Sequence, residues 1–198
     1  SRLSAYEAQP NYAQSQNKIA AQYLKAYTYF NLKDYTTAQR TYSAYMTMID
    51  RGDKTYPDAL NRIGDCHFHS RQFEQAIQAY AQVASIGSTG VDYALLQKAY
   101  AEGLMHQYDQ KVKTLHKLID DYPKSDLADD ALYEMARAEL QMDEYSRAIT
   151  IYNQLLAQYP KSNKSAKSSL ELGMTHRTLK AYDKALEVFK QTIAKYPA

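Results

Sequence analysis

The sequence predicts an all-α fold, an α-solenoid in which about five helix-turn-helix repeats form a right-handed superhelix. Composition is the first observation behind this prediction. Of 198 residues only 6 are glycine and 5 are proline, and valine occurs four times, whereas 20 are tyrosine. A sheet protein needs β-branched residues and frequent turns, so this composition favours helices. The other two observations are a repeated residue pattern and the helical spacing of apolar residues within it.

Five columns of residues recur with a period of 35 to 38 residues. The reference column is aromatic: Tyr35, Phe73, Tyr108, Tyr145 and Tyr182. Nine residues earlier stands a small residue: Ala26, Gly64, Ala99, Ala136 and Gly173. Three residues after the aromatic stands Ala38, Ala76, Lys111, Ala148 or Ala185. Seven residues after it stands Tyr42, Tyr80, Leu115, Tyr152 or Phe189, and fifteen after it, in the last three repeats, Pro123, Pro160 or Pro197. This coincidence indicates tandem repeats.

Each repeat is predicted to contain two helices. In the fourth repeat the apolar residues from Tyr145 to Tyr159 fall at steps of three and four, which is one face of a helix. Ala136 and Ala148 are expected to let the two helices approach closely, while Tyr145 and Tyr152 fill the space around them. The Tyr-Pro-Lys-Ser turns at 122–125 and 159–162 end a helix, because proline blocks its continuation. The residues at 125 and 126, serine and aspartate, are then expected to cap the next helix.

The pattern divides the chain into a lead-in and five repeats. The predicted segments are a lead-in or the tail of a preceding helix at 1–16, then repeats at 17–54, 55–90, 91–125, 126–162 and 163–198. Loops are expected at about 51–57 and 86–91, where glycine marks turns. Because the chain starts without Met and ends directly after a repeat, we expect a processed or excised piece of a longer protein, or a C-terminal repeat covered by self-association.

These columns resemble the signature of the tetratricopeptide repeat (TPR) family over about residues 17–197. The fifth repeat carries it through Gly173, Tyr182, Ala185, Phe189 and Pro197. The family's early Trp column is absent, and Lys111 at a helix crossing is expected to loosen the packing there, with its aliphatic stem along apolar surface. The long repeats and Tyr-Pro-x-Ser turns look like those of bacterial cell-envelope members, such as Tol–Pal-associated coordinators and outer-membrane assembly lipoproteins. That likeness implies a periplasmic location.

Several function classes are disfavoured by the residues themselves. Lys+Arg 24 against Asp+Glu 22 leaves a net charge of +2, too balanced for a nucleic-acid partner by default. No apolar run is long enough for a transmembrane helix, and a single cysteine excludes an internal disulfide. His67 and His69 point to different sides of one helix and cannot chelate one metal ion, and the carboxylates between 126 and 130 suit helix capping better than a cation. Cys66 is interpreted as a buried structural thiol. We therefore expect no enzyme, no cofactor and no metal.

The candidate site is a peptide-binding surface on the first helices of the repeats. Tyrosine offers a large apolar area and a hydroxyl at low entropic cost, and amide or guanidinium groups bind peptide backbone or carboxylates. The candidate residues are Tyr23, Tyr27, Asn61, Asp65, Tyr93, Tyr100, Tyr133, Arg137 and Arg177. The alternative for each tyrosine is packing between neighbouring repeats. The Lys/Asn carboxylate clamp of the family is absent from the matching columns.

The function predicted from these residues is a non-catalytic protein–protein interaction scaffold that binds a peptide or a partner helix in the concave groove lined by the first helices of the repeats. The alternatives are a structural spacer and an accessory module of a longer protein. The Arg-Gly-Asp tripeptide at 51–53 is interpreted as a helix-ending turn rather than a recognition motif. Acidic residues dominate at 120–147 and basic residues at 161–198. Helix-dipole matching and solvated faces explain this asymmetry, with end-to-end attraction between molecules as the alternative.

Overall fold

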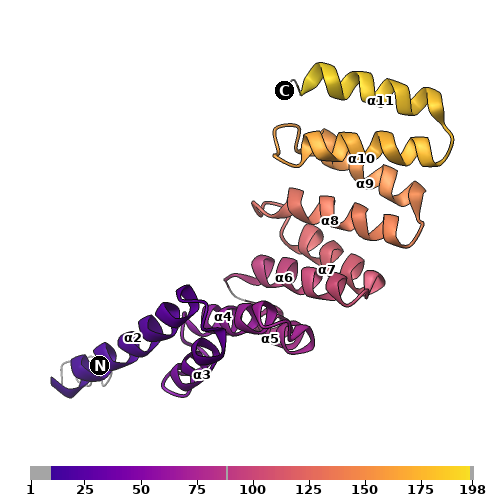
Figure 1. Cartoon of the computed structure of the whole chain (residues 1–198). Coiled ribbons are helices and arrows are strands. Elements are labelled where there is room, and N and C mark those ends of the chain that lie inside the picture. Colours follow the sequence, from indigo (N-terminus) through magenta and orange to yellow (C-terminus); the bar gives the residue numbers. More distant parts are fainter. Residues whose placement is uncertain (1–9, 88, 197–198) are drawn as a thin grey trace. The chain divides into compact units, whose positions relative to one another are not determined.

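The computed structural model describes residues 10–87 and 89–196, and within them it contains ten α-helices and no strand (Figure 1). The helices are α2 (Pro10–Asn31), α3 (Tyr35–Met46), α4 (Tyr56–His69), α5 (Phe73–Ile86), α6 (Val91–Leu104), α7 (Tyr108–Asp121), α8 (Ala128–Gln141), α9 (Tyr145–Gln158), α10 (Ser165–Thr178) and α11 (Tyr182–Lys195). The predicted all-α fold and the two helices of each repeat are confirmed. In the described part of the chain, no helix is long and apolar enough to cross a membrane.

The chain divides into two compact units, with the boundary between Gln97 and Lys98 inside α6. In unit 1, up to Gln97, α2 packs against α3, α3 against α4, and α4 against α5. In unit 2, from Lys98 onwards, each helix from α7 to α10 packs against the one that follows. Within each unit the helices thus stack in chain order, as tandem helix pairs require.

The repeated columns form the core. Among the fully buried large side chains are Tyr42, Tyr80 and Tyr152, and the alanines of the small column are buried as well. A Cβ on Gly64 would lie 2.5 Å from a ring carbon of Tyr80, and a Cβ on Gly173 would collide with the ring of Phe189. The small residue of the first helix therefore makes room for the large residue of the second, as the spacing predicted.

The turn inside each helix pair depends on one residue with left-handed backbone, and none of these residues is glycine. They are Lys33, Arg71, His106, Asp143 and Lys180, with φ between 59° and 61°. The next residue donates its N–H back across the turn, for example from Asp34 to the carbonyl of Tyr29 at 3.0 Å. This satisfies a carbonyl that the helix end would leave unpaired. In each helix pair the residue of the aromatic column stands two positions after the left-handed residue.

Two local predictions differ from the structure. Tyr56 and Pro57 belong to the first turn of α4 rather than to a loop, because proline fits where a helix has no N–H bond to lose. The N-cap of α8 is Leu127, without a side-chain cap, and Ser125 instead accepts a hydrogen bond from the Leu127 N–H at 3.2 Å. Part of the predicted lead-in lies in α2, and the rest falls outside the described residues. The repeat boundaries stay a prediction.

Candidate protein-binding surfaces

The candidate residues fall into two groups, one in each unit. Unit 1 contains Tyr23 and Tyr27 on α2, Asn61 and Asp65 on α4, and Tyr93 on α6. Unit 2 contains Tyr100 on α6, Tyr133 and Arg137 on α8, and Arg177 on α10. The two groups are described separately below, since each unit carries its own surface.

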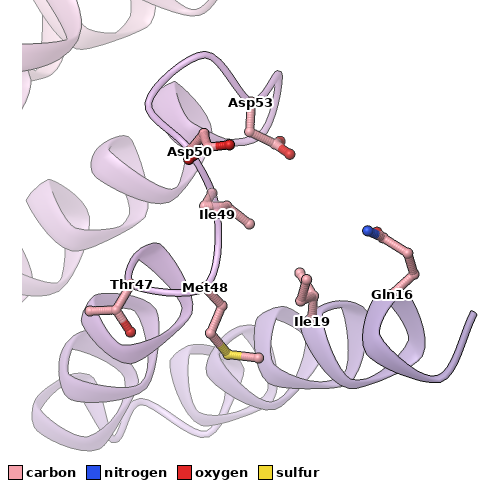
Figure 2. A pocket seen from close by; sticks show the side chains of 7 residues that line it. All are labelled: Gln16, Ile19, Thr47, Met48, Ile49, Asp50 and Asp53. Atoms are coloured by element: carbon pink, nitrogen blue, oxygen red, sulfur yellow. The ribbon is translucent and has the colours of Figure 1, made fainter. Parts of the chain in front are cut away.

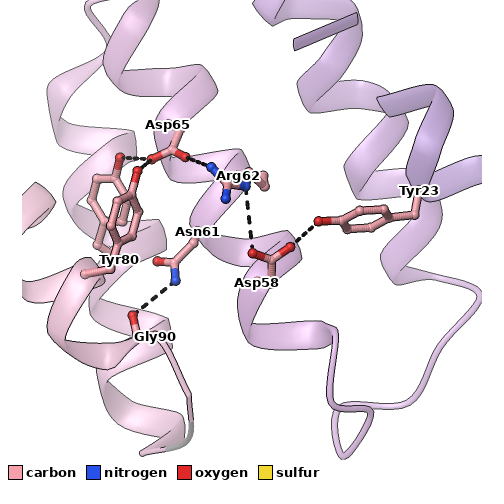
Figure 3. Close-up of polar contacts among 8 residues, drawn as sticks. Tyr23, Asp58, Asn61, Arg62, Asp65, Tyr80 and Gly90 are labelled. Atoms are coloured by element: carbon pink, nitrogen blue, oxygen red, sulfur yellow. Dashed lines mark hydrogen bonds and ion pairs between the residues drawn. The ribbon is translucent and has the colours of Figure 1, made fainter. Parts of the chain in front are cut away.

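In unit 1 the buried carboxylate of Asp65 is the centre of a polar network (Figure 3). It accepts hydrogen bonds from the hydroxyls of Tyr80 at 2.8 Å and Tyr93 at 2.9 Å, and from Arg62 Nη1 at 3.0 Å. Burial raises the pKa of Asp65, although these three donors act in the opposite direction. Burial and the Asp65 carboxylate also raise the pKa of both tyrosines. The network ties α4 to α5 and to the first half of α6.

The same face of α4 continues the network toward α2 (Figure 3). The Tyr23 hydroxyl donates to Asp58, and Arg62 Nε lies 3.7 Å from the other Asp58 oxygen. Asn61 donates its amide N–H to the carbonyl of Gly90 at 3.2 Å, just before α6 begins. Tyr23 also packs edge-on against the rings of Tyr42 and Tyr45. Asn61, Asp65 and Tyr93 therefore have partners inside unit 1.

Other side chains of α2 remain exposed. Leu24 and Tyr27 both face solvent. Between the first half of α2 and the segment that follows α3 lies a pocket of about 270 Å³ (Figure 2), lined by Gln16, Ile19, Thr47, Met48, Ile49, Asp50 and Asp53. A second pocket of about 360 Å³ shares Ile19 and extends to Leu24. Unit 1 therefore offers apolar area with carboxylates at its edge.

Asp53 is part of that edge and of the Arg-Gly-Asp tripeptide. Its Oδ1 accepts hydrogen bonds from the N–H of Thr55 at 2.8 Å and from its hydroxyl at 2.5 Å, and these bonds lower the pKa of Asp53. The aspartate thus organises the turn that precedes α4. This geometry agrees with the interpretation of the tripeptide as a turn.

In unit 2 Lys111 forms a buried ion pair. Its Nζ lies 2.5 Å from Glu134 Oε2, and the other carboxylate oxygen of Glu134 lies 3.2 Å from Arg137 Nη1. Gly103 leaves room for the lysine stem, which would contact a Cβ there at 3.1 Å. The expectation that the lysine loosens the packing with its stem along apolar surface was incomplete. The charge is buried and has a partner on the following helix, because an unpaired buried ammonium would be very costly.

Two cations lie over one buried ring at the junction of α8 and α10. The Tyr133 ring centroid is 5.7 Å from Arg137 Cζ and 5.4 Å from Lys167 Nζ. Such distances are typical of cation–π contacts. Tyr133 itself is buried, whereas Arg137 and Lys167 are exposed. Tyr100 is half-buried, and burial raises its pKa to about 12.

The exposed face of α10 carries apolar side chains between cations. Leu170 is 47% exposed and Met174 is 40% exposed. Lys167 precedes them on the same face and Arg177 follows them. Neither cation forms an ion pair with any residue in the described part of unit 2. We name Arg137, Lys167, Leu170, Met174 and Arg177 the α8–α10 surface.

Three tetratricopeptide repeat family models match the sequence, over residues 23–90, 93–125 and 127–198. This chain is a tetratricopeptide repeat protein. Among curated proteins, no sequence matches it significantly.

Solved structures of similar fold include other TPR proteins. A MamA protein has a TM-score of 0.74 at 17% identity, covering 90% of this chain and 92% of that one. A TPR protein from Parabacteroides merdae has a TM-score of 0.73 at 18% identity, covering 93% of this chain and 68% of that one. YrrB, a TPR protein with an unusual peptide-binding site, has a TM-score of 0.69 at 14% identity, covering 94% and 92%. At these identities the likeness shows the fold.

The two histidines and the cysteine of α4 in this TPR protein are either bound to neighbouring side chains or buried. His67 hydrogen-bonds Gln72 at 2.7 Å, while His69 stacks on Tyr35 at 4.6 Å between ring centroids, so the two imidazoles do point apart. Cys66 is buried, as predicted from the sequence, and burial raises the pKa of its thiol to about 12. Among the described residues no group of His, Cys, Asp and Glu is arranged to hold a metal ion.

The candidate residues predicted from the sequence omit three side chains of these TPR surfaces. Arg62, which joins Asp58 to Asp65, has the spacing of both i−4 and i+3 ion pairs, and that signal was available. Leu170 and Met174 lie on the helix face that the sequence pattern predicts to line a groove, but they are absent from the candidate residues. Their exposure in the structure shows that both are available to a partner.

Proposed function

We propose that this TPR protein is a non-catalytic scaffold that binds an extended peptide or a helix of a partner protein on the α8–α10 surface. One observation carries the proposal. Leu170 and Met174 are exposed one helical turn apart on α10, and the exposed cations Lys167 and Arg177 stand before and after them. Large apolar side chains bordered by arginine are characteristic of the residues that dominate binding energy in protein interfaces.

The chemistry of this surface favours an acidic segment with apolar side chains. Arg137 is held near Glu134 and over Tyr133, so its position is fixed while half of its side chain stays exposed. Lys167 is similarly placed over the Tyr133 ring. A carboxylate of the partner would meet two oriented cations, and its neighbouring apolar side chains would cover Leu170 and Met174.

A second contact area in unit 1 supports the same function. Leu24, Tyr27 and the two pockets beside α2 offer apolar area with Asp50 and Asp53 at the edge. The function of YrrB gives support by analogy, since its peptide-binding site is built on a similar fold. The periplasmic location implied by the cell-envelope resemblance stays a prediction.

The test is selection of peptides on the immobilised chain, followed by fluorescence polarisation with the selected peptides. We expect enrichment of Glu and Asp beside Leu, Ile or Phe. Leu170→Ser with Met174→Ser should weaken binding by about tenfold or more, and Arg137→Ala should weaken it mainly at low salt. Leu32→Ser, at another exposed leucine, is the matched control and should bind normally.

Two outcomes would contradict the proposal. If no peptide is selected, the alternative of a structural spacer gains support. If selected peptides bind the Leu170→Ser, Met174→Ser variant as well as the unchanged chain, the binding surface lies elsewhere.

A further inference from the structure

Helix α11 presents an apolar stripe that no described residue covers. Tyr182 is 63% exposed, Leu186 is 53% exposed and Ile193 is 75% exposed. With the half-buried Phe189 these residues follow steps of four, three and four, so they lie along one side of the helix. Figure 1 shows α11 (yellow) at the end of the unit 2 stack, beside α10.

The equivalent residues of other helix pairs show what this stripe is shaped to contact. On α3 they are Tyr35, Gln39 and Met46, all half-buried. Tyr35 stacks on His69 of α4, Gln39 lines a pocket together with Cys66 of α4, and Met46 packs against a core that includes Ile63. On α9 the equivalents Tyr145, Ile149 and Leu156 are half-buried as well. This side of a second helix therefore receives another helix wherever one follows.

Helix α2 is not a suitable partner for that stripe. In α4, α8 and α10 the residues that pack toward the preceding helix are buried, and their central members are Ile63, Met135 and Leu172. In α2 the same column holds Lys25, which is exposed, as are the neighbouring column members Ala21 and Thr28. Covering α11 with α2 of another molecule would place the ammonium of this lysine at an apolar contact, where its desolvation costs free energy.

We propose that two copies of this chain associate through α11, with the two helices antiparallel about a twofold axis. Antiparallel pairing places Tyr182 opposite Ile193 of the second copy and Leu186 opposite Phe189, so the stripe covers itself. The same register brings Asp183 of one copy near Lys190 of the other, twice by symmetry. Both residues are exposed and have no ion pair among the described residues. Both the apolar pattern and the charges of α11 therefore favour a second copy of this chain as the partner that covers the stripe.

The first experiment measures mass by sedimentation velocity over a dilution series of the chain. We expect a dimer, with twice the 22.7 kDa of the monomer, that dissociates on dilution. Leu186→Glu with Ile193→Glu should raise the dimer dissociation constant by about tenfold or more, because both carboxylates would enter the apolar contact. Leu32→Glu with Leu104→Glu is the matched control, since these leucines are exposed elsewhere, and it should leave the dissociation constant unchanged.

The second experiment tests the antiparallel register. Asp183→Lys alone and Lys190→Asp alone should each weaken the dimer by placing like charges opposite each other, and the double variant should restore it. Circular dichroism verifies that each variant keeps its helices. A monomer at every concentration would overturn the proposal and leave the stripe for a different partner. A dimer that the Leu186→Glu, Ile193→Glu variant does not weaken would overturn this interface. A dimer that the double charge exchange does not restore would overturn the antiparallel register.

Discussion

Both units bury ionisable side chains between helices, but they satisfy them differently. In unit 1 the Asp65 carboxylate is surrounded by two tyrosine hydroxyls and Arg62, all of which are donors. In unit 2 the Lys111 ammonium stands in a column that is otherwise alanine, and Glu134 is its ion-pair partner. Asp65 has an ion pair with Arg62, but its other two donors are hydroxyls, which can donate to the carboxyl whether or not it is charged. The contact between Lys111 and Glu134 needs both charges. Repeats of one pattern can therefore bury a charge in two ways. One uses several donors, of which some are neutral, and the other depends on a single charged partner.

The largest expected effect on stability comes from breaking the buried ion pair between Lys111 and Glu134. Glu134→Ala leaves Lys111 buried without its partner, and we expect a loss of about 3–5 kcal/mol in the free energy of unfolding. The measurement is urea unfolding followed by circular dichroism. Adding Lys111→Ala should recover at least half of the loss, because alanine occupies this column in the other four repeats. A double variant as unstable as Glu134→Ala alone would show that the buried charge is not the cause.

In unit 1 the removal of one donor should cost less, because two others remain. Tyr93→Phe removes one hydrogen bond to Asp65 and should lower the free energy of unfolding by about 1.5–3 kcal/mol. Tyr27→Phe, at an exposed hydroxyl, is the matched control and should change little. If both variants have the stability of the unchanged chain, the Asp65 network contributes no net stability and the contrast between the units is lost.

The close helix crossing next to Asp65 should respond to added volume. Gly64→Ala places a methyl group against the Tyr80 ring, whose hydroxyl also serves the network, and should cost about 1–3 kcal/mol. At Gly52 an added Cβ has no atom within 4 Å, so Gly52→Ala is the control. Thermal unfolding of both variants distinguishes a packing effect from a general effect of alanine. Equal melting temperatures would argue that Tyr80 moves aside without cost.

The smallest expected effect is a dependence on pH with opposite signs at two aspartates. The pKa of Asp65 is raised in the folded chain, so the folded state binds this proton more tightly than the unfolded state. As pH falls from neutral toward 3.8, the unchanged chain should gain stability relative to Asp65→Asn. Hydrogen bonds from Thr55 lower the pKa of Asp53 below 3.8 in the folded chain, so the folded state binds this proton less tightly than the unfolded state. As pH falls below 3.8, the unchanged chain should therefore lose stability relative to Asp53→Asn.

Urea unfolding at a series of pH values from about 7 to about 3 measures both differences. The two curves should diverge in opposite directions. If the Asp65→Asn difference does not move with pH, or moves with the same sign as Asp53→Asn, the buried carboxylate is not destabilised by its surroundings as inferred.

The repeat pattern predicted the fold because it encodes local geometry. A small residue such as Gly64 and a ring such as Tyr80 recur together because each pair shares one crossing. The caps were less predictable. Ser125 accepts a bond within a turn instead of capping α8, and Lys33 and its equivalents adopt left-handed backbone without glycine. Side-chain type alone does not fix these choices, since the surrounding turn decides them.

The sequence by itself determined that this chain is a stack of helix pairs, since helical spacing and the repeated columns are properties of neighbouring residues. Only the tertiary structure decided which of the candidate residues are available to a partner. Asp65 and Tyr93 bind each other across 28 residues, and Lys111 meets Glu134 across 23. Leu186 is exposed at a position where an apolar residue suggests a core, and the exposure of Leu170 makes it available to a partner. The physical reason is that burial is set by neighbours distant in sequence, which a local pattern does not contain.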